Sequence, residues 1–309
     1  MKKFLVAFAI LIFSLPAFAF EVQITDDKTI TLIPMSPHKV NKVQDDWADM
    51  WCRIWGICEE PAPTPDPAGE KDYSKGITPL AHDLQMSGVP VLDQGQYGTC
   101  VTFAATAALD ALLVKGDFVS QQCSLAFNLG QGNNYWNGAY KISEIIDPIK
   151  QYGVVSKSSC TKPYADRNQK LTVAEYQALV DKTVDVSKVT IVYKATADIA
   201  TVKRALDAGH RVAIGFLLDG GSSEAVRGFD ILYSGQKYKG GLWACKQGSS
   251  VNHCVKSNAG HEIVIVGYDD AQKLFKIRNS WSQTVGAQGD YFMSYEFFSK
   301  MAIDMSEIW

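Results

Sequence analysis

The chain has 309 residues, of which 47% are hydrophobic and 20% are charged, so it can bury a large core in one or two globular units. Its formal net charge is −3, from 30 basic and 33 acidic residues. This balance excludes the basic excess that is typical of nucleic-acid-binding proteins, and no long acidic tail is present. Charge therefore indicates no class of partner.

The N-terminus has the pattern of a secretory signal peptide. Lys2 and Lys3 precede an apolar run at 4–15, and residues 17–19 read Ala-Phe-Ala, as at a signal-peptidase site. We predict a signal peptide at 1–19 and an exported protein, secreted or periplasmic. The apolar run is short for a membrane span and no later segment reaches about 18 uninterrupted apolar residues, so we expect no membrane association after cleavage. The alternative is an uncleaved membrane anchor.

A proline-rich segment interrupts the chain after the signal. Residues 61–69 include four prolines within seven positions, which neither a helix nor a central strand accommodates. We predict a linker here, within an N-terminal arm at 20–77 that precedes a main domain at 78–309. The arm contains a β-like run at 29–34 but is too small to hold a core alone. It is either a removable pro-segment or an arm packed on the main domain.

The main domain is predicted to be helical first and rich in strands later. The segment 100–115 is almost all Ala, Leu, Val, Phe and Thr, and Gly116 follows it, which indicates a helix buried on most sides. Further helices are expected at 142–152, 174–181 and 199–208. Strands are expected at 211–218, 262–268, 274–279 and 290–294. This order predicts an α+β fold with two lobes.

An exported protein with an odd number of cysteines is expected to form disulfides and to leave one thiol unpaired. The seven are Cys52, Cys58, Cys100, Cys123, Cys160, Cys245 and Cys254. Cys52 lies close to Cys58, and a loop with Gly and Ser separates Cys245 from Cys254, which favours two local bridges. Cys123 with Cys160 would form the third. Spacing does not prove this connectivity, but this set of three disulfides leaves Cys100 as the unpaired cysteine.

Cys100 follows a glycine-containing loop and begins the first predicted helix. A cysteine is a good nucleophile as a thiolate, and its free pKa of about 8.5 falls at a helix N-terminus beside an imidazolium. Gly95 and Gly98 allow the backbone to approach a substrate carbonyl closely. The alternative is a buried structural cysteine, which is common for this residue type.

A nucleophilic cysteine needs a histidine as base. The chain has five: His38, His82, His210, His253 and His261. His261 opens the predicted strand 262–268, a placement that should fix the imidazole rigidly at a sheet edge. The next strand ends in Asn279, Ser280 and Trp281, which offer an amide to hold the ring and an indole to shield that bond from water.

Taken together, these segments resemble the papain-like cysteine peptidases. Residues 94–103, QGQYGTCVTF, are similar to the family's Gln-Gly-x-Cys-Gly-Ser-Cys-Trp-x-Phe, and 119–123 to its Leu-Ser-Glu-Gln segment that leads to a disulfide cysteine. Residues 137–139 stand where its Asn-Gly-Gly would be. Residues 260–268 resemble its histidine strand, and 279–292 its Asn-Ser-Trp-Gly segment.

The resemblance implies a helical left lobe with a buried central helix, an antiparallel β-barrel-like right lobe and an active-site cleft between them. It implies hydrolysis of peptides or proteins through an acyl-enzyme, without metal or organic cofactor. Cys100 would be the nucleophile, His261 the general base and later acid, and Asn279 the residue that orients the ring. Gln94 and the Cys100 N–H would form the oxyanion hole. Substrate-binding positions would be Gly138, Ala139, Gly260, Glu262 and Trp281.

Several positions depart from the family pattern. Tyr97 and Trp136 stand where the family has two cysteines that form a disulfide, and we predict that the two rings pack together in its place. Other replacements loosen the walls of the expected groove but remove no catalytic group: Thr99, Val101, Ser282 and Val285.

Glu262 stands where the family usually has a small residue lining its main specificity pocket. If its side chain points inward, a basic residue two positions before the cut would be favoured. If it points outward, it is a solvated carboxylate on a strand, and this second interpretation is slightly preferred.

Two other functions are compatible with these residues, namely a catalytically silent binding protein with the same fold and a cell-wall amidase or transpeptidase. The presence of all four catalytic residue types argues against the first, and Asn279 with Trp281 against the second. The arm at 20–77 lacks the long charged helical pattern of many pro-segments in the family, so self-inhibition by the arm is a hypothesis.

Overall fold

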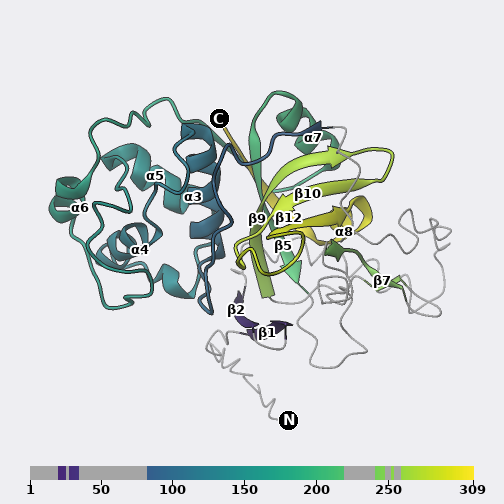
Figure 1. Cartoon of the computed structure of the whole chain (residues 1–309), viewed down its shortest axis with the longest axis horizontal. Helices are drawn as coiled ribbons and strands as arrows, with labels where there is room; N and C mark the ends of the chain where they lie inside the picture. Colours follow the sequence, from purple (N-terminus) through teal and green to yellow (C-terminus); the bar gives the residue numbers. More distant parts are fainter. Residues whose placement is uncertain (1–19, 26–27, 35–81, 219–240, 248–251, 254–258) are drawn as a thin grey trace, which may run out of the picture.

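The computed structural model describes residues 20–25, 28–34, 82–218, 241–247, 252–253 and 259–309. A helical lobe and a sheet lobe lie side by side, with helix α3 (Cys100–Leu113) against strand β9 (Ala259–Asp269) at their junction (Figure 1). The predicted two-lobed α+β fold is therefore confirmed. Within the described ranges, no helix has the length and apolar character needed to cross a membrane.

The helical lobe is built around α3, which is buried along nearly its whole length. The other described helices of this lobe are α4 (Gln121–Gly130), the short 3-10 helix η3 (Tyr135–Asn137), α5 (Ser143–Tyr152) and α6 (Val173–Leu179). Helices α7 (Ile199–Asp207) and α8 (Tyr295–Met301) belong to the sheet lobe. Helix α3 ends at Leu113, two residues before the predicted end, because Val114 adopts the left-handed conformation with φ 55°.

Side-chain caps fix where several helices begin. The Ser120 hydroxyl accepts the Cys123 N–H at the start of α4, and Asp198 and Ser294 do the same for α7 and α8. Thr172 and Glu175 form a reciprocal capping box at the start of α6. These caps satisfy backbone N–H groups that would otherwise lack partners.

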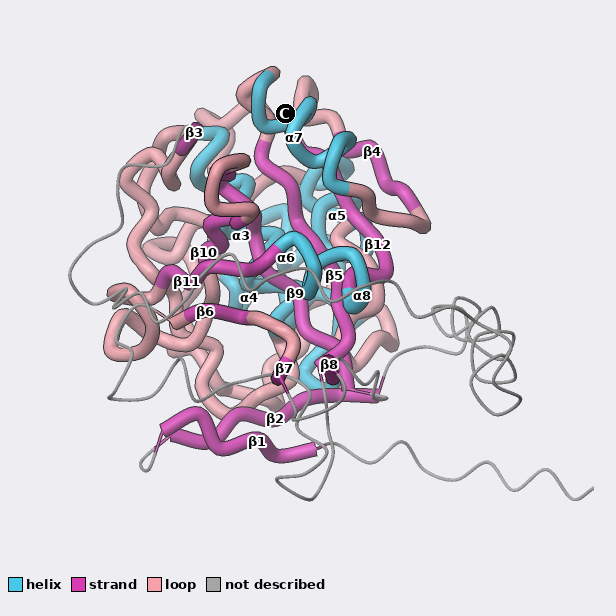
Figure 2. Tube along the Cα trace, turned by 90° about the vertical axis from the view of Figure 1, so that its right-hand side faces the viewer, coloured by secondary structure: helices cyan, strands magenta, loops and turns pink. Residues whose placement is uncertain are grey.

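The strands of the sheet lobe form one large sheet, in which β4, β12, β5, β9, β10, β11 and β6 follow one another (Figure 2). Their bounds are β4 (Ile191–Lys194), β12 (Ala302–Ile308), β5 (Arg211–Leu218), β10 (Leu274–Arg278), β11 (Asp290–Ser294) and β6 (Leu242–Trp243). A short β3 (His82–Asp83) pairs with β9, and β7 (Lys246–Gln247) pairs with β8 (Asn252–His253).

One expectation about this sheet is corrected. The sheet is open, since the end strands β4 and β6 do not pair with each other in the described part of the chain, and this replaces the barrel-like description of the lobe. Strand β9 pairs with β5 through residues 259–265 and with β10 from residue 264 onward, so His261 pairs with Phe216 of β5 and lies beyond the end of β10.

The N-terminal arm contributes a hairpin of β1 (Phe20–Thr25) and β2 (Lys28–Pro34). Strand β2 pairs antiparallel with β9, with Ile33 opposite Gly260. Both views place this hairpin at one end of the molecule, at the end of β9 (Figures 1 and 2). The rest of the arm, including the predicted linker at 61–69, and the predicted signal peptide lie outside the described residues.

The two faces of the sheet bury different cores. One face packs with α7 and α8 around Phe216, Ile263, Ile265 and Phe297. The other face contributes Val264 and Val266 to a core shared with α3 and α5. Because side chains alternate along β9, odd-numbered residues face the first core and even-numbered residues face α3.

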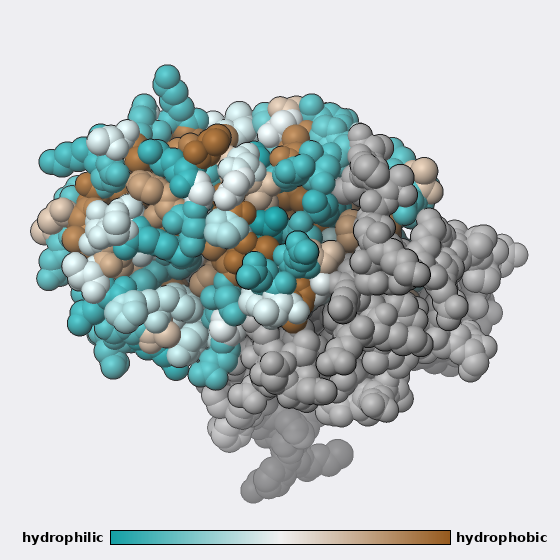
Figure 3. Space-filling view, in the orientation of Figure 1, coloured by the Kyte–Doolittle hydropathy of each residue, from teal (hydrophilic) through white to brown (hydrophobic). Residues whose placement is uncertain are grey.

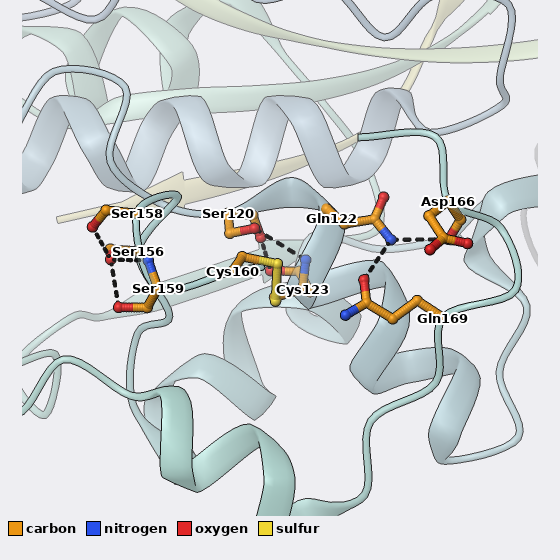
Figure 4. The surroundings of a disulfide bond; sticks show 10 residues. Ser120, Gln122, Cys123, Ser156, Ser158, Ser159, Cys160, Asp166 and Gln169 are labelled. Atoms are coloured by element: carbon orange, nitrogen blue, oxygen red, sulfur yellow. Dashed lines mark hydrogen bonds between the residues drawn. A yellow bond between two sulfur atoms is a disulfide. The ribbon is translucent and has the colours of Figure 1, made fainter. Parts of the chain in front are cut away.

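A disulfide joins Cys123 of α4 to Cys160, the pairing that the sequence favoured (Figure 4). Next to it the Ser120 hydroxyl accepts the Cys123 N–H, and further along the chain Ser156 bonds to Ser158 and Ser159. Cys245 is also held in a disulfide. The predicted partner of Cys245 and the predicted pair of Cys52 with Cys58 lie outside the described residues.

On the face seen in Figure 3, the helical lobe is mainly hydrophilic, with hydrophobic side chains in separate groups. The exposed large hydrophobic residues of the described part include Val114, Tyr140, Val192 and Tyr193. Isolated hydrophobic residues of this kind are normal on a globular surface.

Candidate active site

Cys100 is the first residue of α3, where the positive end of the helix dipole favours a thiolate. Its side chain is 4% exposed, and its sulfur takes part in no disulfide. Thr99 precedes it as the N-cap, yet its side chain makes no hydrogen bond to the helix backbone. The cap therefore leaves the first N–H groups of α3 for another acceptor.

Gln94 lies in the loop before α3 and is fully buried. Its Oε1 accepts the hydroxyl of Ser280 at 2.7 Å, and its Nε2 donates to the Tyr97 carbonyl at 2.9 Å. The second bond identifies which end of the amide is nitrogen, because a backbone carbonyl only accepts. An amide NH₂ has two hydrogens, so the second remains for a ligand oxygen.

His261 lies inside β9 with its side chain 2% exposed. Its Nε2 is 2.9 Å from Asn279 Oδ1, which also accepts the backbone N–H of Ser280 at 2.8 Å. Because an amide oxygen only accepts, Nε2 carries the proton of the neutral ring. Nδ1 is then the basic nitrogen, and it has no hydrogen-bond partner in the part of the chain that the structure describes.

Aromatic rings enclose the His261–Asn279 bond. Trp281 stacks on the imidazole with ring centroids 4.6 Å apart. The ring of Phe216 meets it edge to face with centroids 5.6 Å apart, and the tilted ring of Trp243 has its centroid 6.3 Å away. Burial lowers the pKa of His261 to about 4, and the bond to Asn279 opposes this only in part. The ring is therefore a neutral base near pH 7.

The nucleophile loop and the Asn279 loop run against each other. The Gln94 N–H donates to the Ser280 carbonyl at 2.9 Å, the Ser282 N–H donates to the Leu92 carbonyl at 3.1 Å, and Asp93 pairs with Trp281. Together with the packing of α3 on β9, this pairing brings the elements that carry all four predicted catalytic residues to one junction.

Sequence reasoning missed Ser280 and Tyr164. Ser280 lies within the recognised Asn-Ser-Trp segment, which could have drawn attention to it. The Tyr164 hydroxyl lies 2.8 Å from the Thr99 hydroxyl and donates to the Gln94 carbonyl at 3.0 Å. It is separated from Gln94 by 70 positions, and no local pattern marks it.

The predicted substrate-binding residues come from the segment after η3, from β9 and from the Asn279 loop. Gly138 follows η3 with φ 115°, a conformation that favours glycine, and Ala139 is buried. Gly260 pairs with β2 of the arm, and Trp281 stacks on His261.

Glu262 is 3% exposed, so the preferred interpretation of a solvated strand carboxylate is wrong. As an even-numbered residue of β9 it lies on the sheet face toward α3. Gly215 is opposite it on β5, and Asp304 is opposite Gly215 on β12. A methyl group at Gly215 would lie 2.5 Å from Asp304 Oδ1 and 3.1 Å from Glu262 Oε2, so both carboxylates converge there.

The departures from the family pattern are accommodated in the structure. Tyr97 and Trp136 meet edge to face with centroids 5.3 Å apart, within the range of an aromatic pair. Ser282 adopts φ 74°, the left-handed region that favours glycine, and its Oγ contacts Thr284 Oγ1 at 2.7 Å. Val285, like the Val101 beside Cys100, is buried.

No three His, Cys, Asp or Glu side chains of the described ranges are grouped as a metal ion requires. The chemistry available at the junction is that of a thiol, an imidazole and two amides.

Comparison with known proteins identifies the family. A sequence model described as papain family cysteine protease matches residues 79–307. The chain belongs to the papain family of cysteine proteases.

Two relatives illustrate the similarity. A cathepsin L-like proteinase of Phaedon cochleariae is 26% identical over 226 residues, covering 71% of this chain and 61% of that protein. The thiol protease aleurain of Arabidopsis thaliana is 25% identical over 235 residues, covering 73% and 58%. The matches thus span about 60% of the length of these relatives.

Solved structures share the fold. Xylellain, a cysteine protease from Xylella fastidiosa, superposes with a TM-score of 0.53 at 22% identity, covering 81% of this chain and 94% of that one. The proform of the ragweed pollen cysteine protease Amb a 11 gives 0.50 at 18% identity, covering 84% and 73%.

Proposed function

We propose that this protein is an exported cysteine endopeptidase in which Cys100 attacks the carbonyl carbon of a peptide bond. The observation that carries the proposal is the His261–Asn279 bond. It fixes the proton on Nε2, so Nδ1 is the basic nitrogen.

Acylation begins when Nδ1 of His261 takes the proton of the Cys100 thiol. Burial disfavours an isolated imidazolium, so the imidazolium and the thiolate form together as a pair in which each charge compensates the other. The sulfur adds to the carbonyl carbon, and the oxygen becomes an oxyanion. The free hydrogen of Gln94 Nε2 and the N–H of Cys100 would bind it. The imidazolium then protonates the leaving amine, and the C–N bond breaks.

Deacylation reverses these roles. Neutral His261 takes a proton from water, the hydroxyl adds to the thioester carbonyl, and the C–S bond breaks. The acid half of the peptide leaves, and the thiolate is regenerated. Asn279 accepts from Nε2 throughout and keeps the ring in one orientation.

The deciding experiment compares the wild type with Cys100→Ala on a protein substrate and on a cell-wall preparation. We expect cleavage of the protein alone, complete loss in Cys100→Ala, and labelling of one thiol by an epoxide inhibitor. Cleavage of cell wall instead would support an amidase or transpeptidase. Binding of peptide by both forms without any cleavage would support a silent binding protein.

We further propose that the N-terminal arm restrains the enzyme. Strand β2 pairs with Gly260, which directly precedes His261, so the arm lies on the strand that carries the base. The similar Amb a 11 structure is titled as a proform. We expect activity to appear as the chain is cut between about residues 60 and 90. Full activity of the uncut chain would contradict this role.

Glu262 supports a preference for a basic side chain two residues before the cut. Glu262 and Asp304 bring two buried carboxylates to Gly215 on the face toward α3, and they would attract a cation. We expect a peptide library to show Arg or Lys at this position and Glu262→Ala to weaken that preference. An unchanged preference in the variant would remove Glu262 from the pocket.

A further inference from the structure

We propose that Tyr164 is a positioning residue that holds the two oxyanion-binding elements, the Gln94 loop and the start of α3, in one fixed arrangement. This inference rests on the proposed function. Tyr164 itself would touch neither the substrate nor the reacting atoms.

The Tyr164 hydroxyl connects the residue before Cys100 to the backbone of Gln94. It donates its one hydrogen to the Gln94 carbonyl at 3.0 Å. The Thr99 hydroxyl, 2.8 Å away, must then be the donor in the bond between Thr99 and Tyr164. A continuous chain of hydrogen bonds thus runs from Thr99 through Tyr164 to Gln94.

The Thr99 side chain makes this connection and does not cap α3. A threonine at an N-cap ordinarily accepts a backbone N–H of the first turn, but here it makes no such bond. Its hydroxyl is directed to Tyr164 instead. The N–H groups at the start of the helix are thereby kept for an anionic oxygen, which is the role proposed for the N–H of Cys100.

The ring of Tyr164 is held by three aromatic neighbours. Its centroid is 5.1 Å from Phe103 of α3, 5.5 Å from Trp136 and 6.0 Å from Tyr97. Burial raises the pKa of Tyr164, and nearby Cys100 is among the charges that raise it further. The hydroxyl therefore stays protonated, and remains a donor, across the pH range in which a thiolate forms.

Such an arrangement matters because an oxyanion hole works by being preorganised. The donors must lie within hydrogen-bond distance of the oxygen in the transition state, and small displacements are costly. The Gln94 side chain is fixed by Ser280 from the sheet lobe, whereas its carbonyl is fixed by Tyr164 from the helical lobe. Tyr164 is thus the link that relates the glutamine to the start of α3.

The test is Tyr164→Phe, which keeps the ring and removes only the hydroxyl. The matched control is Tyr176→Phe in the same lobe, since Tyr176 is buried and its hydroxyl likewise donates to a carbonyl, that of Gly153 at 3.2 Å. Three assays are made: kcat and KM on a peptide amide, the inhibition constant of a peptide aldehyde, and the rate of alkylation by iodoacetamide against pH.

We expect Tyr164→Phe to lower kcat by about tenfold with KM nearly unchanged. Aldehyde inhibition should weaken by a similar factor, because the aldehyde adduct carries an oxyanion. Iodoacetamide alkylation and its pH profile should not change, since that reaction needs the thiolate but no oxyanion hole. Tyr176→Phe should leave all three at wild-type values.

Thr99→Val cuts the same chain of hydrogen bonds at its other end. The double variant with Tyr164→Phe should lose little more than either single variant. Wild-type kcat and aldehyde affinity in Tyr164→Phe would overturn the proposal, as would an equal fall in alkylation and turnover, which indicates general damage. Failure of the proposed function is recognised separately, by full activity in Cys100→Ala or by a wild type that cleaves no peptide.

Discussion

The helical lobe and the sheet lobe hold their functional side chains by different means. In the helical lobe, the loop around Gln94 has little regular structure, and side-chain hydrogen bonds from Ser280 and Tyr164 fix it. In the sheet lobe, His261 lies on a strand paired on both sides, and aromatic rings surround it. Polar side chains position the predicted oxyanion-binding glutamine, whereas backbone pairing and aromatic packing hold the predicted base.

The interiors of the lobes differ in the same way. Asp110 of α3 is buried and accepts the N–H groups of Phe118 and Val119, and Gln121 donates to Thr106. The core of the sheet lobe is dominated by large apolar and aromatic side chains. We infer that substitutions at the base should affect activity without unfolding, and that substitutions in the polar interior should affect stability without altering the chemistry.

The largest expected effect is that of His261→Ala, because it removes the base. We expect kcat/KM on a peptide amide to fall by about 10³-fold or more, measured on the fraction of the variant that remains folded. His210→Ala is the matched control. His210 precedes β5 at the end opposite His261 and pairs with Glu307, so activity should stay within about twofold. Comparable activity in both variants would exclude His261 as the base.

The second largest expected effect comes from removing the Cys123–Cys160 disulfide, which should change stability and leave activity unchanged. Replacing both Cys123 and Cys160 by alanine opens a loop of 37 residues, which should lower the free energy of unfolding by about 4 kcal/mol. Urea unfolding measures this loss. The kcat of the protein that remains folded should equal that of the wild type, and a large fall in kcat would show that the helical lobe transmits strain to the site.

A smaller, pH-dependent effect is expected from Asp110. Burial raises its pKa from 3.8 to about 7, so between these values the folded state binds more protons than the unfolded state. Stability should therefore fall as the pH rises from about 4 to about 7, by on the order of a few kcal/mol.

Asp110→Asn should remove this component of the pH dependence. Asp185→Asn is the control, because Asp185 is exposed, its pKa is lowered, and it does not titrate in this window. Urea unfolding at pH 4.5 and 7.5 compares the three proteins. A wild-type difference that persists in Asp110→Asn would assign it to other groups.

Much of the fold could be predicted from local patterns. The Ala-rich run after Cys100 and the apolar runs of β5, β9, β10 and β11 carried clear signals, and these elements were placed within about three residues. Helix α4 was missed because it begins with two polar residues, Gln121 and Gln122. Both are buried, and their side chains bond to residues distant in sequence, which no local pattern indicates. Strand β12 was missed because buried Asp304 and Ser306 interrupt its apolar pattern.

In the candidate site too, residues with a local sequence signal could be predicted and residues that depend on distant contacts could not. Cys100, His261 and Asn279 could be predicted as catalytic residues because each stands in a short segment with its own signal. Tyr164 could not be found, since its role depends on contacts across 65 and 70 positions. The burial of Glu262 also depends on tertiary structure, because strand alternation alone does not say which face is covered.

The smallest expected effect concerns the aromatic pair that replaces a disulfide of the family. Tyr97 and Trp136 join the Gln94 loop to η3, and their edge-to-face contact should couple by about 1 kcal/mol. A double-mutant cycle with Tyr97→Leu and Trp136→Leu, followed by urea unfolding, measures this coupling. The contact between Phe127 and Tyr152, also at 5.3 Å, is the control pair and should give a similar value.

The two pairs should differ in their effect on activity. Tyr97 and Trp136 both contact Tyr164, which bonds to Gln94, so loss of either ring should also lower kcat by a few-fold. Loss of the control pair should leave kcat unchanged. If both cycles gave the same coupling and neither changed kcat, the contact between Tyr97 and Trp136 would stabilise the helical lobe without affecting the Gln94 loop. The hydrogen bond from Thr99 to Tyr164 would then be the remaining connection between the helical lobe and that loop.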